Sequence, residues 1–190
     1  MNVAEPMTLA TDYLICVIAI VFGVRLWRVF RPWSLAFFFT AAGSLFGGTF
    51  HGFGGFAMWK ATIFSIALAS FFLLSGCGRV LTSIGIVKLV ATMSWMIAHD
   101  DFQWVILDYG ISLLLVGIWI RVRPRSAPWV WGSIAVSVLA ALVQHLGFSP
   151  HPHFNHNDLY HVIQIVALWL LYRGGLLMTS STDRPTIPPT

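Results

Sequence analysis

The stretch with the most reactive side chains is 155–161, Asn-His-Asn-Asp-Leu-Tyr-His, at the start of the last apolar segment. Two histidines and an aspartate at the mouth of a membrane helix are costly to insert, because a charge costs roughly 2.5–3.5 kcal/mol near a helix centre. A bound metal ion would offset that cost. On a helix, Asn157 and His161 share a face and Asp158 lies beside them, whereas His156 reaches that face only from a frayed first turn.

The composition is that of an integral membrane protein. Of the 190 residues, 57% are hydrophobic and only 9% are charged, whereas soluble domains carry about 25% charged residues. The basic residues lie in short loops between apolar runs, a pattern that is typical of membrane orientation rather than of nucleic-acid binding. We therefore expect the lipid bilayer as a partner, no nucleic acid, and neither a soluble enzyme nor a disulfide between Cys16 and Cys77.

Seven apolar segments are each close to the roughly 20 residues that a bilayer requires. Clusters of arginine, proline and glycine separate several of them. We expect an all-α fold with one seven-helix transmembrane domain over 1–178, followed by a disordered polar tail over 179–190 that is rich in Ser, Thr and Pro. The predicted helices are 9–28, 33–53, 60–77, 80–98, 103–121, 128–147 and 157–175.

The basic residues are distributed unequally between the two sides of a seven-span arrangement. Every arginine falls on one side, Lys60 alone falls opposite, and Lys88 can snorkel from the fourth segment toward the arginine side. The positive-inside rule then places the N-terminus outside and the C-terminus in the cytoplasm, and we expect the plasma membrane. The arginines are Arg25, Arg28, Arg31, Arg79, Arg121, Arg123, Arg125, Arg173 and Arg184.

The other half of the bundle carries all seven histidines and six of the seven acidic residues. One polar site in the outer leaflet is the economical explanation of this distribution. The histidines are His51, His99, His145, His151, His153, His156 and His161. The first segment also brings Asp12 to this half, and Asp108 is the deepest acid of the second to seventh segments.

Some of these polar residues have ordinary explanations. Asp158 is placed to cap the last helix, where a helix N-terminus favours negative charge. His99 and His145 have the depth of headgroup-level residues. His51 and His161, together with Asp108, are embedded ionisable groups and therefore functional candidates.

Neutral imidazole suits zinc, and a catalytic zinc has three protein ligands and one position for a water of lowered pKa. Ser44 and His51 lie on one face of the second segment, and His51 has the depth of His161. The sequence therefore predicts an outer-leaflet zinc site, which His99 or His145 can also complete. The predicted ligands are His51 and His161 with His156 or Asp158, and the predicted catalytic residues are Asp108 and Ser44.

This pattern resembles the CREST superfamily of seven-helix membrane proteins, which includes alkaline ceramidases and adiponectin/progestin receptors. Ser44 and His51 correspond to a serine and a histidine on the second helix of that superfamily, and 157–161 corresponds to two histidines on the seventh. The resemblance implies zinc held by three histidines and hydrolysis of lipid amides. Here the spacing on the second helix is seven residues rather than four, and Asn157 replaces one histidine. Asp108 or Asp100, from another helix, would replace an acid of the third helix.

Three functions are compatible with these features. The first is a zinc-dependent hydrolase that acts on a lipid amide or ester. The second is an electron-transfer protein with one haem, held by two histidines from different helices. The third is a non-catalytic receptor or transporter, although transporters commonly contain internal repeats and this chain shows no convincing one.

Overall fold

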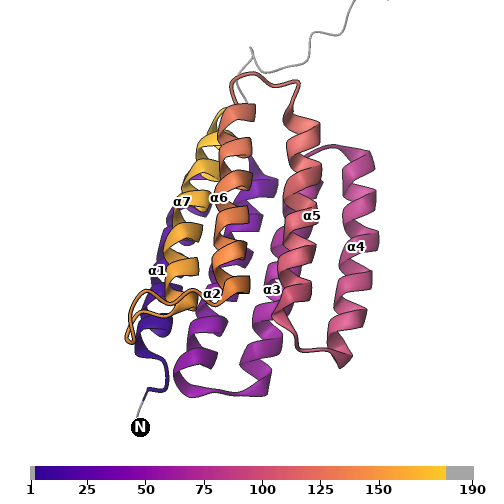
Figure 1. The fold of residues 1–190 in the computed structure, drawn as a ribbon. Coiled ribbons are helices and arrows are strands. Elements are labelled where there is room, and N and C mark those ends of the chain that lie inside the picture. The colour runs from indigo at the N-terminus through magenta and orange to yellow at the C-terminus, as the bar shows by residue number, and fades with distance from the viewer. Residues whose placement is uncertain (1–2, 179–190) are drawn as a thin grey trace, which may run out of the picture.

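The computed structural model describes residues 3–178, which form seven α-helices (Figure 1). All seven are long and apolar enough to cross a membrane, which confirms the all-α seven-helix prediction and indicates a multi-pass membrane protein. The only strand-like pairing among these residues is the isolated bridge between His151 and Phe154. The predicted tail over 179–190 lies outside the described residues. The helices are α1 (Pro6–Leu26), α2 (Arg31–Phe53), α3 (Phe56–Ser75), α4 (Arg79–Ala98), α5 (Phe102–Ile120), α6 (Ala127–Leu146) and α7 (His156–Leu176).

Each helix begins one to four residues before the apolar segment that predicts it. The reason is the chemistry of the first turn, which hydropathy does not score. Helices α1, α2 and α6 each carry a proline in the first two positions, where the missing N–H is not needed. Helix α7 begins with the polar residues 156–158 because Asn155 caps it.

Six of the helices form a closed ring. Each of α1, α2, α3, α5, α6 and α7 packs against the next one in that order, and α7 packs against α1. Helix α4 packs outside this ring, against α3 and α5, and stands at one edge of the molecule in Figure 1. The interior of the bundle is therefore bounded by six helices.

The two ends of the bundle differ in chemistry. Because successive helices run in opposite directions, α1, α3, α5 and α7 begin at the end where α2, α4 and α6 finish (Figure 1). This end carries all the histidines, and we call it the histidine end. The opposite end, where the arginines of the described chain lie, is the arginine end.

The larger of the two apolar core clusters lies mostly in the half of the bundle nearer the arginine end. Trp33, Phe37, Leu74 and Ile120 are fully buried there, and the indole Nε1 of Trp33 donates to the Leu73 carbonyl at 3.1 Å. Such dense packing fixes the positions of the ring helices. The half nearer the histidine end is less completely filled and contains the cavity described below.

Small residues bring α1 and α2 close together at the histidine end. A Cβ atom built on Gly48 would lie 2.8 Å from the Cβ of Asp12, and one built on Gly52 would lie 3.2 Å from a methyl carbon of Leu9. Glycine on α2 therefore permits the close approach, as small residues do between membrane helices generally. The consequence is that polar side chains of α1 reach the interior of the ring.

Candidate functional site

A cavity of about 240 Å³ lies inside the six-helix ring. Its walls come from all six ring helices, and α4 contributes no lining residue over Arg79–Ala98. Much of the wall is apolar, with side chains such as Ile66, Val105 and Leu113. Polar groups gather toward the histidine end: Asp12, His51, Gln144, Asn157 and His161. The cavity thus pairs an apolar wall with a cluster of ionisable and amide groups.

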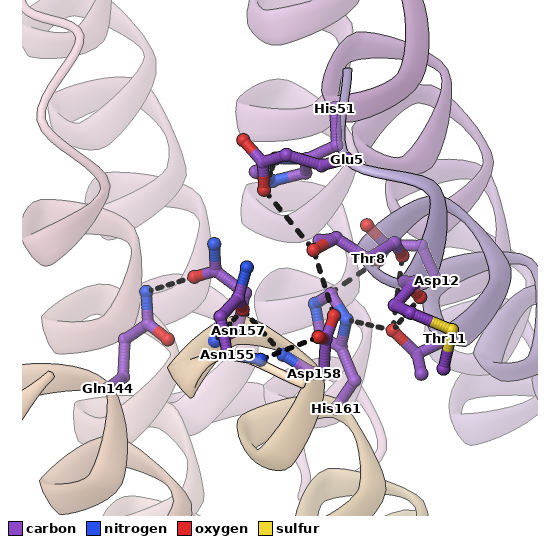
Figure 2. Close-up of polar contacts among 11 residues, drawn as sticks. Glu5, Thr8, Thr11, Asp12, His51, Gln144, Asn155, Asn157, Asp158 and His161 are labelled. Carbon is purple, nitrogen blue, oxygen red and sulfur yellow. Dashed lines mark hydrogen bonds and ion pairs between the residues drawn. The ribbon is translucent and has the colours of Figure 1, made fainter. Parts of the chain in front are cut away.

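His161 is the most buried histidine of this cluster, with 8% of its surface exposed. Its Nδ1 lies 2.9 Å from the Thr11 hydroxyl oxygen, and its Nε2 lies 3.4 Å from Asp12 Oδ1 (Figure 2). The Thr11 hydroxyl can also donate its one proton to a backbone carbonyl. The carbonyl oxygens of Met7 and Thr8 lie 3.0 and 3.1 Å from the hydroxyl oxygen. When that hydroxyl accepts from His161 Nδ1–H, the neutral ring keeps Nε2 as an acceptor that faces Asp12.

The second carboxylate oxygen of Asp12 lies near Gly47 of α2 and Thr62 of α3. A Cβ built on Gly47 would lie 3.6 Å from Asp12 Oδ2 and 3.6 Å from the Thr62 hydroxyl oxygen, with no closer contact than 3.4 Å. Glycine thus leaves a space of methyl size beside the second oxygen of the carboxylate. The Thr62 hydroxyl donates to the Met58 carbonyl at 2.9 Å, so its oxygen retains a free lone pair. A water molecule in this space would have two polar neighbours from the protein.

His51 lines the same cavity from the last turn of α2. Its Nδ1 lies 3.3 Å from a carboxylate oxygen of Glu5, which precedes α1. The same Glu5 oxygen is 3.2 Å from the Thr8 hydroxyl, and the backbone N–H of Ala4 donates to the Gly52 carbonyl. The segment before α1 therefore lies against the end of α2 and supplies His51 with a carboxylate partner (Figure 2).

Asp158 has a structural role that accounts for both of its oxygens. Its Oδ2 accepts from the Asn155 backbone N–H and its Oδ1 accepts from the Thr8 hydroxyl, each at 2.8 Å. Asn155 Oδ1 in turn accepts from the backbone N–H groups of Asn157 and Asp158, which completes a capping box. Neither Asp158 nor His156 is a lining residue of the cavity, and His156 donates its backbone N–H to Ser149.

The two residues predicted to be catalytic lie in different places. Ser44 lines the cavity. Asp108 lies outside it and faces α4, where its Oδ1 accepts from Lys88 Nζ and, at 2.6 Å, from the Thr92 hydroxyl. The predicted alternatives His99 and His145 are not lining residues either, and the ring of His99 stacks on Trp95.

The side chains as they lie do not assemble the predicted zinc site. Within residues 3–178, no group of three or more His, Cys, Asp or Glu side chains is arranged to hold a metal ion. His51 and His161 do line one cavity together with Asp12, but each already contacts a carboxylate, and His161 Nδ1 also contacts Thr11.

The site also contains residues that are not among the predicted ligands or catalytic residues, although Asp12 was placed in this half of the bundle. Asp12, Thr11 and Thr8 lie on one face of α1, at steps of one, three and four. Three polar residues on one face of an otherwise apolar helix are a usable signal, because lipid does not solvate them. Glu5 carries no such signal, since it precedes the helix.

A sequence profile for a family of unknown function, DUF6962, matches residues 7–180. The chain belongs to the DUF6962 family. Comparison with curated proteins and with solved structures found no match. The DUF6962 region contains every lining residue of the cavity, whereas Glu5 precedes it. The resemblance to the CREST superfamily stays a prediction.

Proposed function

We propose that this DUF6962 protein is a membrane hydrolase that cleaves an amide or ester bond of a lipid held in the cavity. The observation that carries the proposal is the Asp12–His161 pair in the wall of a largely apolar cavity, inside a ring of membrane-length helices. An acyl chain suits the apolar wall, and its polar linkage would then lie at the histidine end. Ligand sites generally combine an apolar lining with a few polar groups.

The chemistry proposed for this pair is general acid–base catalysis. A water in the space beside Gly47 gives a proton to the Asp12–His161 pair, and its oxygen attacks the carbonyl carbon of the lipid. The bond from that carbon to nitrogen or oxygen then breaks, and the pair returns the proton to the leaving amine or alcohol. A positioned acid–base group of this kind contributes about 10²–10⁴-fold to rate.

Other lining residues can hold the carbonyl oxygen during the attack. The hydroxyl groups of Tyr109 and Tyr160 and the amides of Asn157 and Gln164 belong to the same wall. The Gln144 amide donates to Asn157 Oδ1 at 2.8 Å, which steadies the Asn157 side chain. Donors placed before the reaction are effective because they need no reorganisation as charge develops.

Zinc stays a prediction of the sequence, because three ligands do not converge among the described residues. The steps above are therefore assigned to the side chains alone. For the orientation, we propose that the histidine end faces outward at the plasma membrane, since the arginines at the opposite end fit the cytoplasmic side.

The decisive experiment incubates the purified protein with a panel of lipid amides and esters in mixed micelles and detects released fatty acid by mass spectrometry. We expect product from the wild type and a loss of about 100-fold or more in Asp12→Asn and His161→Gln. His145→Gln is the matched control, because His145 is exposed at the same end of the bundle and is not a lining residue. It should retain full activity.

Two results would overturn the proposal: no product from folded wild-type protein with any amide or ester, or full activity in Asp12→Asn. Lipid that binds without being cleaved would instead support the receptor or transporter hypothesis. Metal analysis of the same samples, with His51→Ala and His161→Ala, tests zinc. Near-stoichiometric zinc that both substitutions remove would support the metal-dependent form of the reaction, and an absorbing haem would support the electron-transfer alternative.

A further inference from the structure

A second hollow lies on the outside of the bundle, along the line where α1 and α7 pack together. It is open to the outside, has a volume of about 380 Å³ and is lined only by apolar side chains. It shares no lining residue with the cavity inside the ring. We call it the α1–α7 groove. Its walls include Val17, Val21 and Phe22 of α1 and Ile165, Val166 and Trp169 of α7.

Each wall of the groove leads to an arginine at the arginine end. On α1, Val17, Val21 and Arg25 follow one another at steps of four, and on α7 Arg173 follows Trp169 at the same step. Residues four apart share a helix face, so each arginine lies one turn beyond the groove on its own wall. Both arginines are exposed and lie in the last turn of their helices.

The two arginines have no acidic partner among the described residues. Helix α1 carries no acid after Asp12, and α7 carries none after Asp158. The guanidinium of Arg173 instead lies 4.8 Å from the ring centroid of Trp129 and 5.9 Å from that of Trp169. Stacking of this kind holds a guanidinium in place while its N–H donors remain available.

We propose that the α1–α7 groove binds an anionic phospholipid, with one acyl chain along the groove and the phosphate between Arg25 and Arg173. An apolar hollow with an arginine one turn beyond each wall matches the charge and the acyl chain of such a lipid. Guanidinium is suited to phosphate because its planar fork can donate two parallel hydrogen bonds. This site is independent of the hydrolase site.

The walls are a poor match for a second copy of the chain. Helix pairs in membranes pack through small residues, which let the two backbones approach closely. The groove presents branched and aromatic side chains instead, with Phe22 and Trp169 among them. A flexible acyl chain adapts to such a surface more readily than a rigid helix does.

Native mass spectrometry of the full chain in detergent tests the proposal, with phosphatidylglycerol or phosphatidylcholine as the probe. We expect one tightly bound phosphatidylglycerol and weaker binding of phosphatidylcholine. Arg25→Gln combined with Arg173→Gln should weaken phosphatidylglycerol binding roughly tenfold. Arg79→Gln is the matched control, since Arg79 is an exposed arginine at the same end, on the peripheral helix α4. It should leave binding unchanged.

A second variant keeps both charges and fills the groove. Val166→Trp should exclude the acyl chain and weaken phosphatidylglycerol binding, whereas Val87→Trp, on the exposed face of α4, should not. Equal binding of the two lipids, or equal binding by the double arginine variant and Arg79→Gln, would overturn the proposal. A dimer that Val166→Trp abolishes would also overturn it, because a second copy would then occupy the groove. None of these measurements requires hydrolysis. They therefore test the lipid site independently of the proposed reaction.

Discussion

The protein contains two buried pairs of a carboxylate with a basic side chain, and they are built for different tasks. Asp12 and Asp108 are equally buried, at 6% exposure each. Asp108 is held by Lys88 and Thr92 where α4 meets α5, outside the cavity. Asp12 faces His161 in the cavity wall, with a space of methyl size beside its second oxygen. Burial alone therefore does not distinguish the two carboxylates, whereas access to the cavity does.

The Lys88–Asp108 pair has a clear structural use. Helix α4 buries only Gly85 and Met96, so apolar packing secures it less than it secures the ring helices. The ion pair, with the Thr92 hydroxyl and the Asp108 backbone carbonyl as further partners, fastens α4 to α5. The Asp12–His161 pair lies between α1 and α7, which also contact each other directly.

The largest expected effect is that of Asp12→Asn on hydrolysis, a loss of about 10²–10⁴-fold, because the amide cannot take a proton from water. The fold should persist, since the replacement has nearly the same shape. Initial rates of fatty acid release, normalised to folded protein by size-exclusion chromatography, measure it. A comparable loss in Asp108→Asn, without unfolding, would erase the distinction between the two pairs.

Lys88→Met should lower the stability of the fold rather than the rate of hydrolysis. It leaves the Asp108 carboxylate buried without its cation, which costs about 3–5 kcal/mol, and thermal unfolding in detergent should show the loss. Lys88→Met combined with Asp108→Leu should recover much of it, because replacing both partners by apolar groups is often neutral. If the single and double variants unfold at the same temperature, the pair does not fasten α4.

Gly47→Ala should lower the rate of hydrolysis roughly tenfold, which corresponds to an increase of about 1.4 kcal/mol in the activation free energy. The added methyl fits at ordinary contact distances but occupies the space beside Asp12 Oδ2. Gly110→Ala is the matched control, because Gly110 lines the cavity and an added Cβ there meets nothing within 4 Å. Rates and melting temperatures of both variants should be compared. Full activity in Gly47→Ala would show that the attacking water lies elsewhere.

Glu5→Gln should have the smallest effect, a few-fold loss of rate at most. The substitution removes the charge opposite His51 Nδ1, but the Glu5 side chain is 42% exposed and water screens the interaction. The effect should shrink further in high salt, which weakens exposed charge pairs. A loss as large as that of Asp12→Asn would place His51, rather than His161, at the centre of the reaction.

The fold was predictable from the sequence because each helix coincides with one apolar run, and the alternation of helix direction follows from seven consecutive spans. The same reasoning places His51 and His161 at one depth, and both line the cavity. Depth alone does not determine which way a side chain points around its helix. Asp108 and Asp12 both lie in the half nearer the histidine end, yet Asp108 points to α4 and Asp12 to the interior.

The remaining differences have local causes. Asp158 had two predicted roles, metal ligand and helix cap, and the free backbone N–H groups at the start of α7 hold it in the capping box. The exclusion of α4 from the ring depends on which helices pack together, and α3 contacts α5 directly. The hydrophobic periodicity of α4 does not predict that this helix lies outside the ring.

The peripheral position of α4 makes this helix a suitable place for a spectroscopic label. The chain leaves the ring at Ser75 and re-enters it at Phe102, and the ring is closed between those points by α3 against α5. A spectroscopic label on the outward face of α4, for instance at Val87 or Val90, would therefore sense the surrounding bilayer while the walls of the cavity keep their native side chains. Such a probe would report the depth and tilt of the helix in a membrane.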